Sequence, residues 1–220
     1  TKESILEAQF TPGAGNWCTW MFGRDLVNWN NNFTWAKWVT PSRDLISTFK
    51  QEGDEVRFKE SVVYYDCGWS NYYPSDNYPF MYKCRSANSS IIKYRYADVL
   101  LLKAEALIMQ DTPDLEGAAD IIDEVRDRAK LGALSSSTRS NKDALLNALL
   151  KERRLELAFE GQRWFDLVRL DKVEEVMNAV HAKDSGRKAQ VYTYDKNSYR
   201  LPIPQSVIDA NDKIHQNPGY

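Results

Sequence analysis

One stretch of the sequence, residues 151–170 (KERRLELAFEGQRWFDLVRL), constrains the fold more than any other. A solvated amphipathic helix collects its charges on one face, opposite apolar residues that recur with a period near 3.6. Here the charges stand directly among Leu, Phe and Trp; they are Glu152, Arg153, Arg154, Glu156, Glu160, Arg163, Asp166 and Arg169. Several must lie in or beside the core, where ions persist only when paired and hydrogen-bonded. The stretch predicts a framework of ion pairs between packed helices.

The composition excludes several classes of protein. The 220 residues are 43% hydrophobic and 27% charged, as in a soluble globular chain with one sizeable core or two small ones. The net charge of −2 gives no general attraction to nucleic acid or anionic lipid. No apolar run approaches the ~18 residues that a membrane span needs.

The sequence divides into three segments. Residues 1–93 hold most of the tryptophans with little periodicity, and we expect short strands, long loops and one helix at about residues 42–51. Residues 94–180 have helical periodicity throughout. Residues 181–220 should form an extended tail packed on the same domain. The prolines at 202 and 204 disfavour helix before residue 205, and we expect a turn or two of helix only at residues 205–210.

The middle segment predicts two consecutive helical hairpins. We expect helices over residues 94–110, 114–131, 142–160 and 163–179, with Gly161 separating the last two. Short connections make consecutive helices antiparallel. The first helix is apolar almost all round, which predicts a central, buried position. The predicted fold class is all-α, with hairpins similar to tetratricopeptide repeats and a loop-rich, aromatic-rich segment packed on them.

Four motifs in this order resemble the C-terminal half of the SusD/RagB family. They are YRYADVLLLKAEA at 94–106, VRDRA at 125–129, ERRLELAFEGQRWFDL at 152–167, and LPIP at 201–204 with the closing QNPGY. The segment 41–57 is similar to that family's preceding helix and its turn, here Asp54-Glu55-Val56-Arg57. The resemblance therefore covers about residues 41–220.

The resemblance implies a surface-exposed lipoprotein on the outer membrane of Bacteroidetes-type bacteria. Such proteins bind a glycan or another nutrient, deliver it to a SusC-like TonB-dependent transporter, and are not enzymes. We expect the N-terminal half of the same protein, with the signal peptide and the lipid-bearing Cys, to lie outside this chain. The alternative is a helical-repeat interaction module that docks the transporter or a peptide and has no sugar affinity of its own.

Aromatic residues interleaved with amides in two loops, residues 11–40 and 66–82, form the candidate ligand face. Sugars lay their apolar C–H faces on indole or phenol rings, while amide side chains bond their hydroxyls. For any single ring, a role in a small core of its irregular loop is favoured, but across the two clusters together we expect at least one ring to contact ligand. The predicted ligand-binding residues are Trp17, Trp20, Trp29, Trp35, Trp69, Tyr72 and Tyr73. Stacking on nucleic-acid bases needs a basic groove, and these loops carry few charges.

The carboxylates raise the alternative of a glycoside hydrolase, which needs two carboxyl groups facing one sugar. Glu152, Glu156 and Glu160 share a helix face at i, i+4 spacing. Arginines follow them closely, as Arg163 follows Glu160 and Arg169 follows Asp166, and arginine lowers a carboxyl pKa. A structural role is therefore favoured, and we predict no catalytic residue.

Cysteine and histidine give no sign of a metal or nucleophile site. The three cysteines have no ligand spacing, although Cys67 and Cys84 could form a disulfide in an oxidising compartment. His181 and His215 lie near no candidate nucleophile. We predict neither a metal nor a cofactor.

Overall fold

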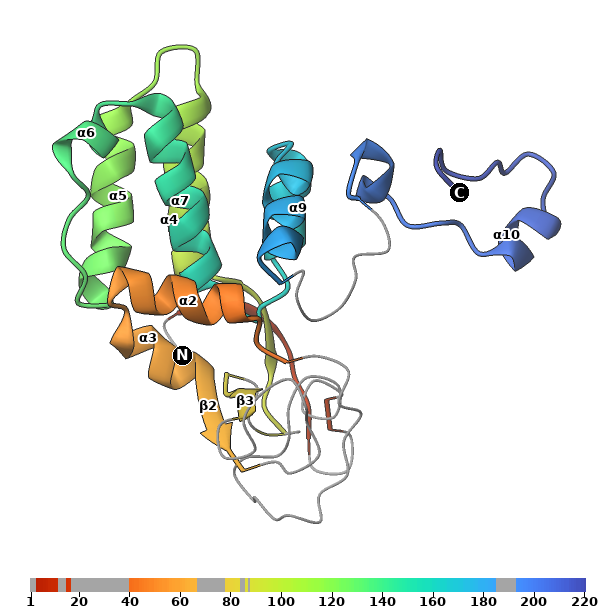
Figure 1. Ribbon diagram of the computed structural model, residues 1–220, viewed down its shortest axis with the longest axis horizontal. Helices are drawn as coiled ribbons and strands as arrows, with labels where there is room; N and C mark the ends of the chain where they lie inside the picture. The colour runs from red at the N-terminus through yellow and green to blue at the C-terminus, as the bar shows by residue number, and fades with distance from the viewer. Residues whose placement is uncertain are drawn as a thin grey trace. The chain divides into compact units, whose positions relative to one another are not determined.

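Figure 1 shows the computed structural model of the chain. It describes residues 3–11, 15–16, 40–66, 78–83, 86, 88–184 and 193–220. The chain forms two compact units, Thr1–Arg163 and Trp164–Tyr220.

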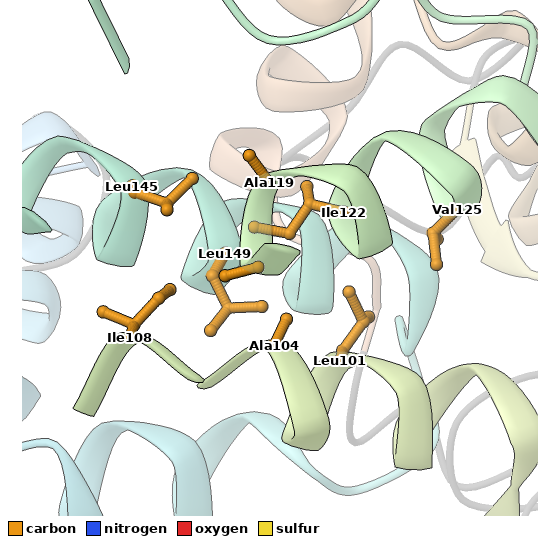
Figure 2. Close-up of a cluster of buried hydrophobic side chains, with 9 residues drawn as sticks. Leu101, Ala104, Ile108, Ala119, Ile122, Val125, Leu145 and Leu149 are labelled. Atoms are coloured by element: carbon orange, nitrogen blue, oxygen red, sulfur yellow. The ribbon is translucent and has the colours of Figure 1, made fainter. Parts of the chain in front are cut away.

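Three long helices make the principal core of the first unit and lie side by side in Figure 1. They are α4 (Tyr96–Met109), α5 (Leu115–Arg128) and α7 (Lys142–Glu156), and the short α6 (Ser136–Arg139) lies in the connection before α7. The buried core consists of Leu101, Ala104, Ile108, Ala118, Ala119, Ile122, Val125, Leu145 and Leu149. In Figure 2 the labelled side chains of this cluster meet between the helices. Small alanines at these contacts allow close approach of the helix axes.

Side-chain caps set where these helices begin. The carboxylate of Asp114 accepts a hydrogen bond from the Gly117 N–H at 2.9 Å, ahead of α5. The amide oxygen of Asn141 accepts one from the Ala144 N–H at 2.9 Å, ahead of α7. Each cap satisfies a backbone donor that has no partner inside the helix.

Two shorter helices, α2 (Arg43–Glu52) and α3 (Glu55–Ser61), pack at the end of α7. Phe49 of α2 is fully buried in a second cluster with Leu45, Leu155 and Ala158. Gly53 separates the helices with a φ of 68°, a left-handed conformation that glycine adopts without steric cost. The sequence predicted α2 but gave only a turn at residues 54–57, and α3 was missed.

The strands described in the first unit form two small antiparallel sheets. In one, β1 (Ser4–Ala8) pairs with β4 (Ile91–Arg95), and in the other β2 (Val62–Tyr65) pairs with β3 (Tyr78–Met81). Strand β4 passes directly into α4 at Arg95. The first predicted helix therefore begins two residues later than expected, because β1 holds residues 94 and 95 in a ladder.

The chain reverses sharply after α7. This helix ends at Glu156, earlier than the predicted residue 160. Phe159 and Gly161 then adopt left-handed conformations with φ of 67° and 81°, which no continuous α-helix can contain.

The second unit begins with α8 (Arg163–Arg169), whose first residue lies at the boundary, and α9 (Val173–Asp184). The prediction of one continuous helix over 163–179 was wrong, because Asp171 has a φ of 53° and breaks it. The amide of Asn178 exchanges two 2.9 Å hydrogen bonds with the backbone of Tyr194. These bonds hold the segment after residue 193 against α9.

The tail contains a 3-10 turn, η1 (Lys196–Tyr199), and the predicted short helix, α10 (Gln205–Asp209). Gln216 exchanges two hydrogen bonds with the backbone of Ile203, at 2.8 and 2.9 Å, and the Asn217 amide donates to the Leu201 carbonyl at 2.7 Å. The LPIP and QNPGY motifs are thus joined by amide contacts.

The predicted fold class is confirmed, since the described residues are mostly helical and are built on helical hairpins. The three-segment division of the chain stays a prediction. The expectation that the first helix is central and buried was wrong in part. Although Leu101, Ala104 and Ile108 of α4 are buried, Tyr96 and Met109 are each 51% exposed, because the core contacts only one side of α4.

Candidate functional site

The predicted ligand face lies outside the residues that the structure describes. This applies to all seven candidates, Trp17, Trp20, Trp29, Trp35, Trp69, Tyr72 and Tyr73, and to the three cysteines. Their role stays a prediction. At the edge of the second loop, Tyr78 is described; it is 6% exposed and its ring centroid lies 5.1 Å from that of Phe80. Tyr78 therefore contributes to a small local core.

The most concentrated chemistry among the described residues is an ionic network at the end of α7. Arg57 of α3 donates from Nε to Asp54 at 2.5 Å, and from Nη1 to Glu152 at 2.5 Å and Glu156 at 3.1 Å. The side chains of Asp54 and Glu152 are 0% and 1% exposed. Arg57 thus links the start of α3 to residues far along the sequence.

Arg95, where β4 passes into α4, binds the neighbouring turn. Its Nη1 donates to a Glu156 carboxylate oxygen at 2.6 Å, its Nη2 to the Glu156 carbonyl at 2.7 Å, and its Nε to Glu160 at 2.7 Å. Lys83 adds a 2.8 Å contact to Glu160, and Arg128 also binds Glu156. The carboxylate of Glu156 therefore accepts from three arginines, Arg57 included, while its side chain is 4% exposed.

Burial and pairing act in opposite directions on these groups. Burial alone would raise the pKa of Glu156, but Arg95 and Arg128 outweigh it and lower that pKa to about 2. For Glu152 burial wins over Arg57, and its pKa is raised. Burial also lowers the pKa of Lys83, against the attraction of Glu160. The pKa values of Glu152 and Glu156, neighbours on one face of α7, are therefore shifted in opposite directions.

The predicted framework of ion pairs is confirmed. Arg153 pairs with Asp98 at 2.9 Å, and Arg154 pairs with Asp44 at 2.7 Å. In the second unit Arg169 pairs with Asp166 at 2.8 Å, as its spacing predicted.

The sequence spacing suggested that Glu160 pairs with Arg163, and this expectation was wrong. Glu160 contacts Lys83 and Arg95, whereas Arg163 donates to the backbone carbonyl of Leu150 at 2.9 Å. The reason is the reversal at Gly161, which removes the helical geometry that brings residues three apart together.

A cavity of about 490 Å³ opens beside this network. One part of its wall is apolar and comes from α3, β3, β4 and the turn after α7; it is formed by Val56, Met81, Ile91, Ile92 and Phe159. The other part carries four cations and four carboxylates, which are Arg57, Lys83, Arg95 and Arg128 with Glu3, Glu60, Glu156 and Glu160. Among the described lining residues, positive and negative side chains are therefore equal in number.

Two donor atoms of residues that line the cavity are themselves buried away from solvent and have no hydrogen-bond partner among the described residues. They are Nη2 of Arg57 and Oγ of Ser61. An unpaired buried donor costs about 1–3 kcal/mol.

The sequence indicated Arg57 and Arg95 only as parts of motifs, and the cavity was not predicted. Its lining residues come from α3, β4 and the end of α7, which lie far apart in the sequence. The one available signal was that the carboxylates of residues 151–170 need cationic partners, which arginines elsewhere in the sequence could supply.

A further surface is apolar and exposed. The exposed apolar side chains lie on β1, β4 and α4, with Ile5 59%, Leu6 53%, Tyr94 52%, Tyr96 51% and Val99 44% exposed. Clusters of this kind often contact other protein surfaces.

Two negative findings apply to the described part of the chain alone. No group of three or more His, Cys, Asp or Glu residues there is arranged to hold a metal ion. Within the same residues, no helix has the length and apolar character to cross a membrane.

Comparison with known proteins identifies the family. The sequence profile of the SusD family matches residues 77–220. The chain belongs to the SusD family. Two SusD-like proteins of Formosa agariphila are similar to it, P38 at 41% identity over 139 residues and P2 at 34% over 142 residues. These matches cover 60% and 62% of this chain but only 25% and 27% of those proteins.

Solved SusD structures share the fold over the whole chain. A SusD-like protein from Bacteroides fragilis superposes with a TM-score of 0.73 at 20% identity, covering 100% of this chain and 54% of that one. A laminarin-binding SusD-like protein superposes with a TM-score of 0.65 at 26% identity, covering 99% of this chain and 50% of that one. This SusD-family chain thus spans about half the length of these solved relatives.

Proposed function

We propose that this chain is part of a glycan-binding protein of the bacterial cell surface. The observation that carries the proposal is its 26% identity, over 99% of its length, to a SusD-like protein named for binding laminarin. We further propose that the bound glycan, or another nutrient, passes to a TonB-dependent outer-membrane transporter of the SusC type. In this proposal a lipid on a Cys outside the chain anchors the protein to the outer membrane.

The proposed ligand face is the pair of aromatic loops, with sugar stacked on some of Trp17, Trp20, Trp29, Trp35, Trp69, Tyr72 and Tyr73. The division of roles is supported by the first unit's helices. Its ionic network and apolar cluster tie α2, α3, β4 and α7 together. Because these contacts hold the helices together, the scaffold would stay rigid while the aromatic loops bind the ligand.

Binding without catalysis is the proposed mode of action. A glycosidase acid needs a pKa near the working pH. Arg95 and Arg128 hold the pKa of Glu156 at about 2, and Glu160 is held by Arg95 and Lys83. These contacts favour a structural role for both carboxylates.

The proposal is tested by electrophoresis in native gels that contain laminarin. We expect the chain to be retarded, and expect alanine at Trp20, Trp29 or Trp69 to reduce the retardation because a stacked ring contributes strongly to sugar binding. Phe165→Ala is the matched control, since this ring is 65% exposed in the second unit. Unchanged migration of all three folded tryptophan variants would refute the assignment of these rings, and absence of retardation by any glycan tested would refute glycan binding.

The exposed apolar surface of β1, β4 and α4 favours a second function, docking to another protein surface. This function would give copurification with a membrane transporter in the absence of sugar. Charged replacements at Leu6 and Tyr96, both more than half exposed, would then abolish copurification and leave gel retardation unchanged.

A further inference from the structure

We propose that the outer side of helix α4 is a docking surface for an amphipathic helix from a part of the same polypeptide that this chain does not include. This contact is separate from the proposed glycan face, which lies on the aromatic loops. The three helices that define the surface, α4, α5 and α7, all belong to the first unit.

Apolar residues recur along two opposite sides of α4. Those on the inner side are buried; they are Ala97, Leu101, Ala104 and Ile108. With 3.6 residues per turn, four others lie on the opposite side. We name these four the outer stripe; they are Val99, Leu102, Ala106 and Met109. Their numbers follow the a and d positions of a heptad, which form a narrow apolar seam along a helix.

The outer stripe is exposed along its length. Val99, Leu102 and Met109 are 44%, 39% and 51% exposed, and Ala106 is exposed as well. The neighbouring helices differ, because every exposed residue of α5 and α7 is charged or is the amide Asn147. A surface helix normally turns such a polar face to water. Among these three helices, α4 therefore stands apart in presenting an apolar seam on its exposed side.

The spacing of the outer stripe fits a helix as its partner. In heptad packing, a side chain of one helix inserts among four residues of the other, and the axes cross at about 20°. Ala106 lies between Leu102 and Met109 in the stripe, so its small side chain leaves room for a larger one from the partner. A strand fits less well, because its side chains alternate with a period of two.

The size of the outer stripe favours a partner within the same polypeptide. Separate proteins that associate stably bury roughly 800 Å² each, from about 20–30 residues a side. Four side chains on one helix fall far short of that. Within one polypeptide, a linker holds the partner at an effective concentration that reaches the millimolar range, so a small apolar contact is sufficient.

The length of the solved relatives is consistent with such a partner. The two superposed SusD-family structures match 100% and 99% of this chain, yet the match covers only 54% and 50% of those proteins. In this proposal the partner helix belongs to the corresponding further part of this polypeptide. The transporter docking proposed above then uses β1, β4 and the start of α4, and not the outer stripe.

The test is cysteine labelling in two polypeptides, the 220-residue chain and the whole polypeptide that its gene encodes. Leu102→Cys places the reporter in the outer stripe, and Asn147→Cys, at an exposed position of α7, is the matched control. Peptide mass spectrometry reads maleimide labelling at the introduced residue alone. We expect both reporters to react at similar rates in the 220-residue chain. In the whole polypeptide, the reporter at position 102 should react at least about tenfold more slowly, because only a local opening exposes it.

A charge in the outer stripe gives an independent arm. Leu102→Glu should lower the unfolding midpoint of the whole polypeptide by several degrees, because its carboxylate would be buried without a cation. The same substitution should leave the midpoint of the 220-residue chain nearly unchanged, since the side chain there faces water. Asn147→Glu is the control and should leave both midpoints nearly unchanged.

Equal labelling at positions 102 and 147 in the whole polypeptide would overturn the proposal. So would slow labelling at position 102 in the 220-residue chain, which would assign the outer stripe to a contact within that chain. Protection that appears only at high protein concentration would assign it to a second copy, and protection only after a membrane transporter is added would assign it to the transporter. None of these results alters retardation in laminarin gels, so this proposal and glycan binding fail separately.

Discussion

Two groups of ion pairs in the first unit use the same chemistry in opposite surroundings. In the buried network Glu156 is 4% exposed and accepts from Arg57, Arg95 and Arg128. In the exposed group Arg139 of α6 binds Glu116, which is 73% exposed, and Asp120, which is 67% exposed.

The difference lies in what happens when a partner is removed. Water replaces a lost partner at the surface, so exposed pairs contribute little. A buried charge has no such replacement, so breaking the pair is costly even where the intact pair itself adds little stability. The buried group should therefore control stability, and the exposed group should not.

The largest expected effect is at Glu156. Glu156→Gln leaves three arginines facing a neutral amide, and we expect a loss of about 3–5 kcal/mol in the free energy of unfolding. Urea unfolding followed by circular dichroism measures it. Glu116→Gln makes the same chemical change in the exposed group and should leave the midpoint nearly unchanged. Equal effects of the two substitutions would contradict the comparison.

The pH dependence should be the next largest effect. The pKa of Glu156 is about 2 in the folded chain against a reference value of 4.5. Its contribution is therefore present above about pH 4.5 and is lost as the pH falls toward 2, by about 3 kcal/mol. Glu152, whose pKa is raised, acts in the opposite sense and reduces the slope.

Unfolding midpoints measured from pH 7 down to pH 2 test this dependence. The curve of the unaltered chain should fall steeply below about pH 4.5, whereas that of Glu156→Gln should be flatter. Parallel curves would show that Glu156 is not the group responsible.

The smallest effect is expected at Arg139. Arg139→Gln removes contacts to Glu116, Asp120 and Asp123, yet two of these carboxylates already face water. The midpoint should shift far less than for Glu156→Gln, and ~1 M salt should abolish the shift because it screens exposed charges. A large shift that persists in high salt would mean that the exposed group is structural too.

The sequence predicted that the charges of residues 151–170 form a buried ionic network, but it did not predict which residues pair with them. Charges placed among Leu155, Leu157 and Phe159 could only be paired ions, and this was predictable from their neighbours alone. Which groups would pair with them was not, because Arg57 and Arg95 lie 95 and 61 residues from their partners on α7. Only the fold brings these groups together.

Helix bodies were predicted better than helix ends. Caps at Ser42, Asp114 and Asn141 are local signals and were close to the observed starts. The breaks at Phe159 and Asp171 depend on left-handed conformations in residues that rarely adopt them. No spacing pattern announces such a break.

The candidate site divides in the same way. Ring chemistry selected the aromatic loops, and that selection remains a prediction. The cavity arises from contacts among α3, β4 and the end of α7, which no single motif contains.

The joined tail motifs reverse an ordinary expectation about substitution. From residue 193 onward none of the described residues is buried, so this region keeps its shape through polar links such as those of Gln216 and Asn217. Large hydrophobic positions like Leu201, which is 81% exposed, should accept many replacements. Gln216 and Asn217 should accept almost no replacements, because in this region side-chain hydrogen bonds, and not buried apolar side chains, maintain the structure.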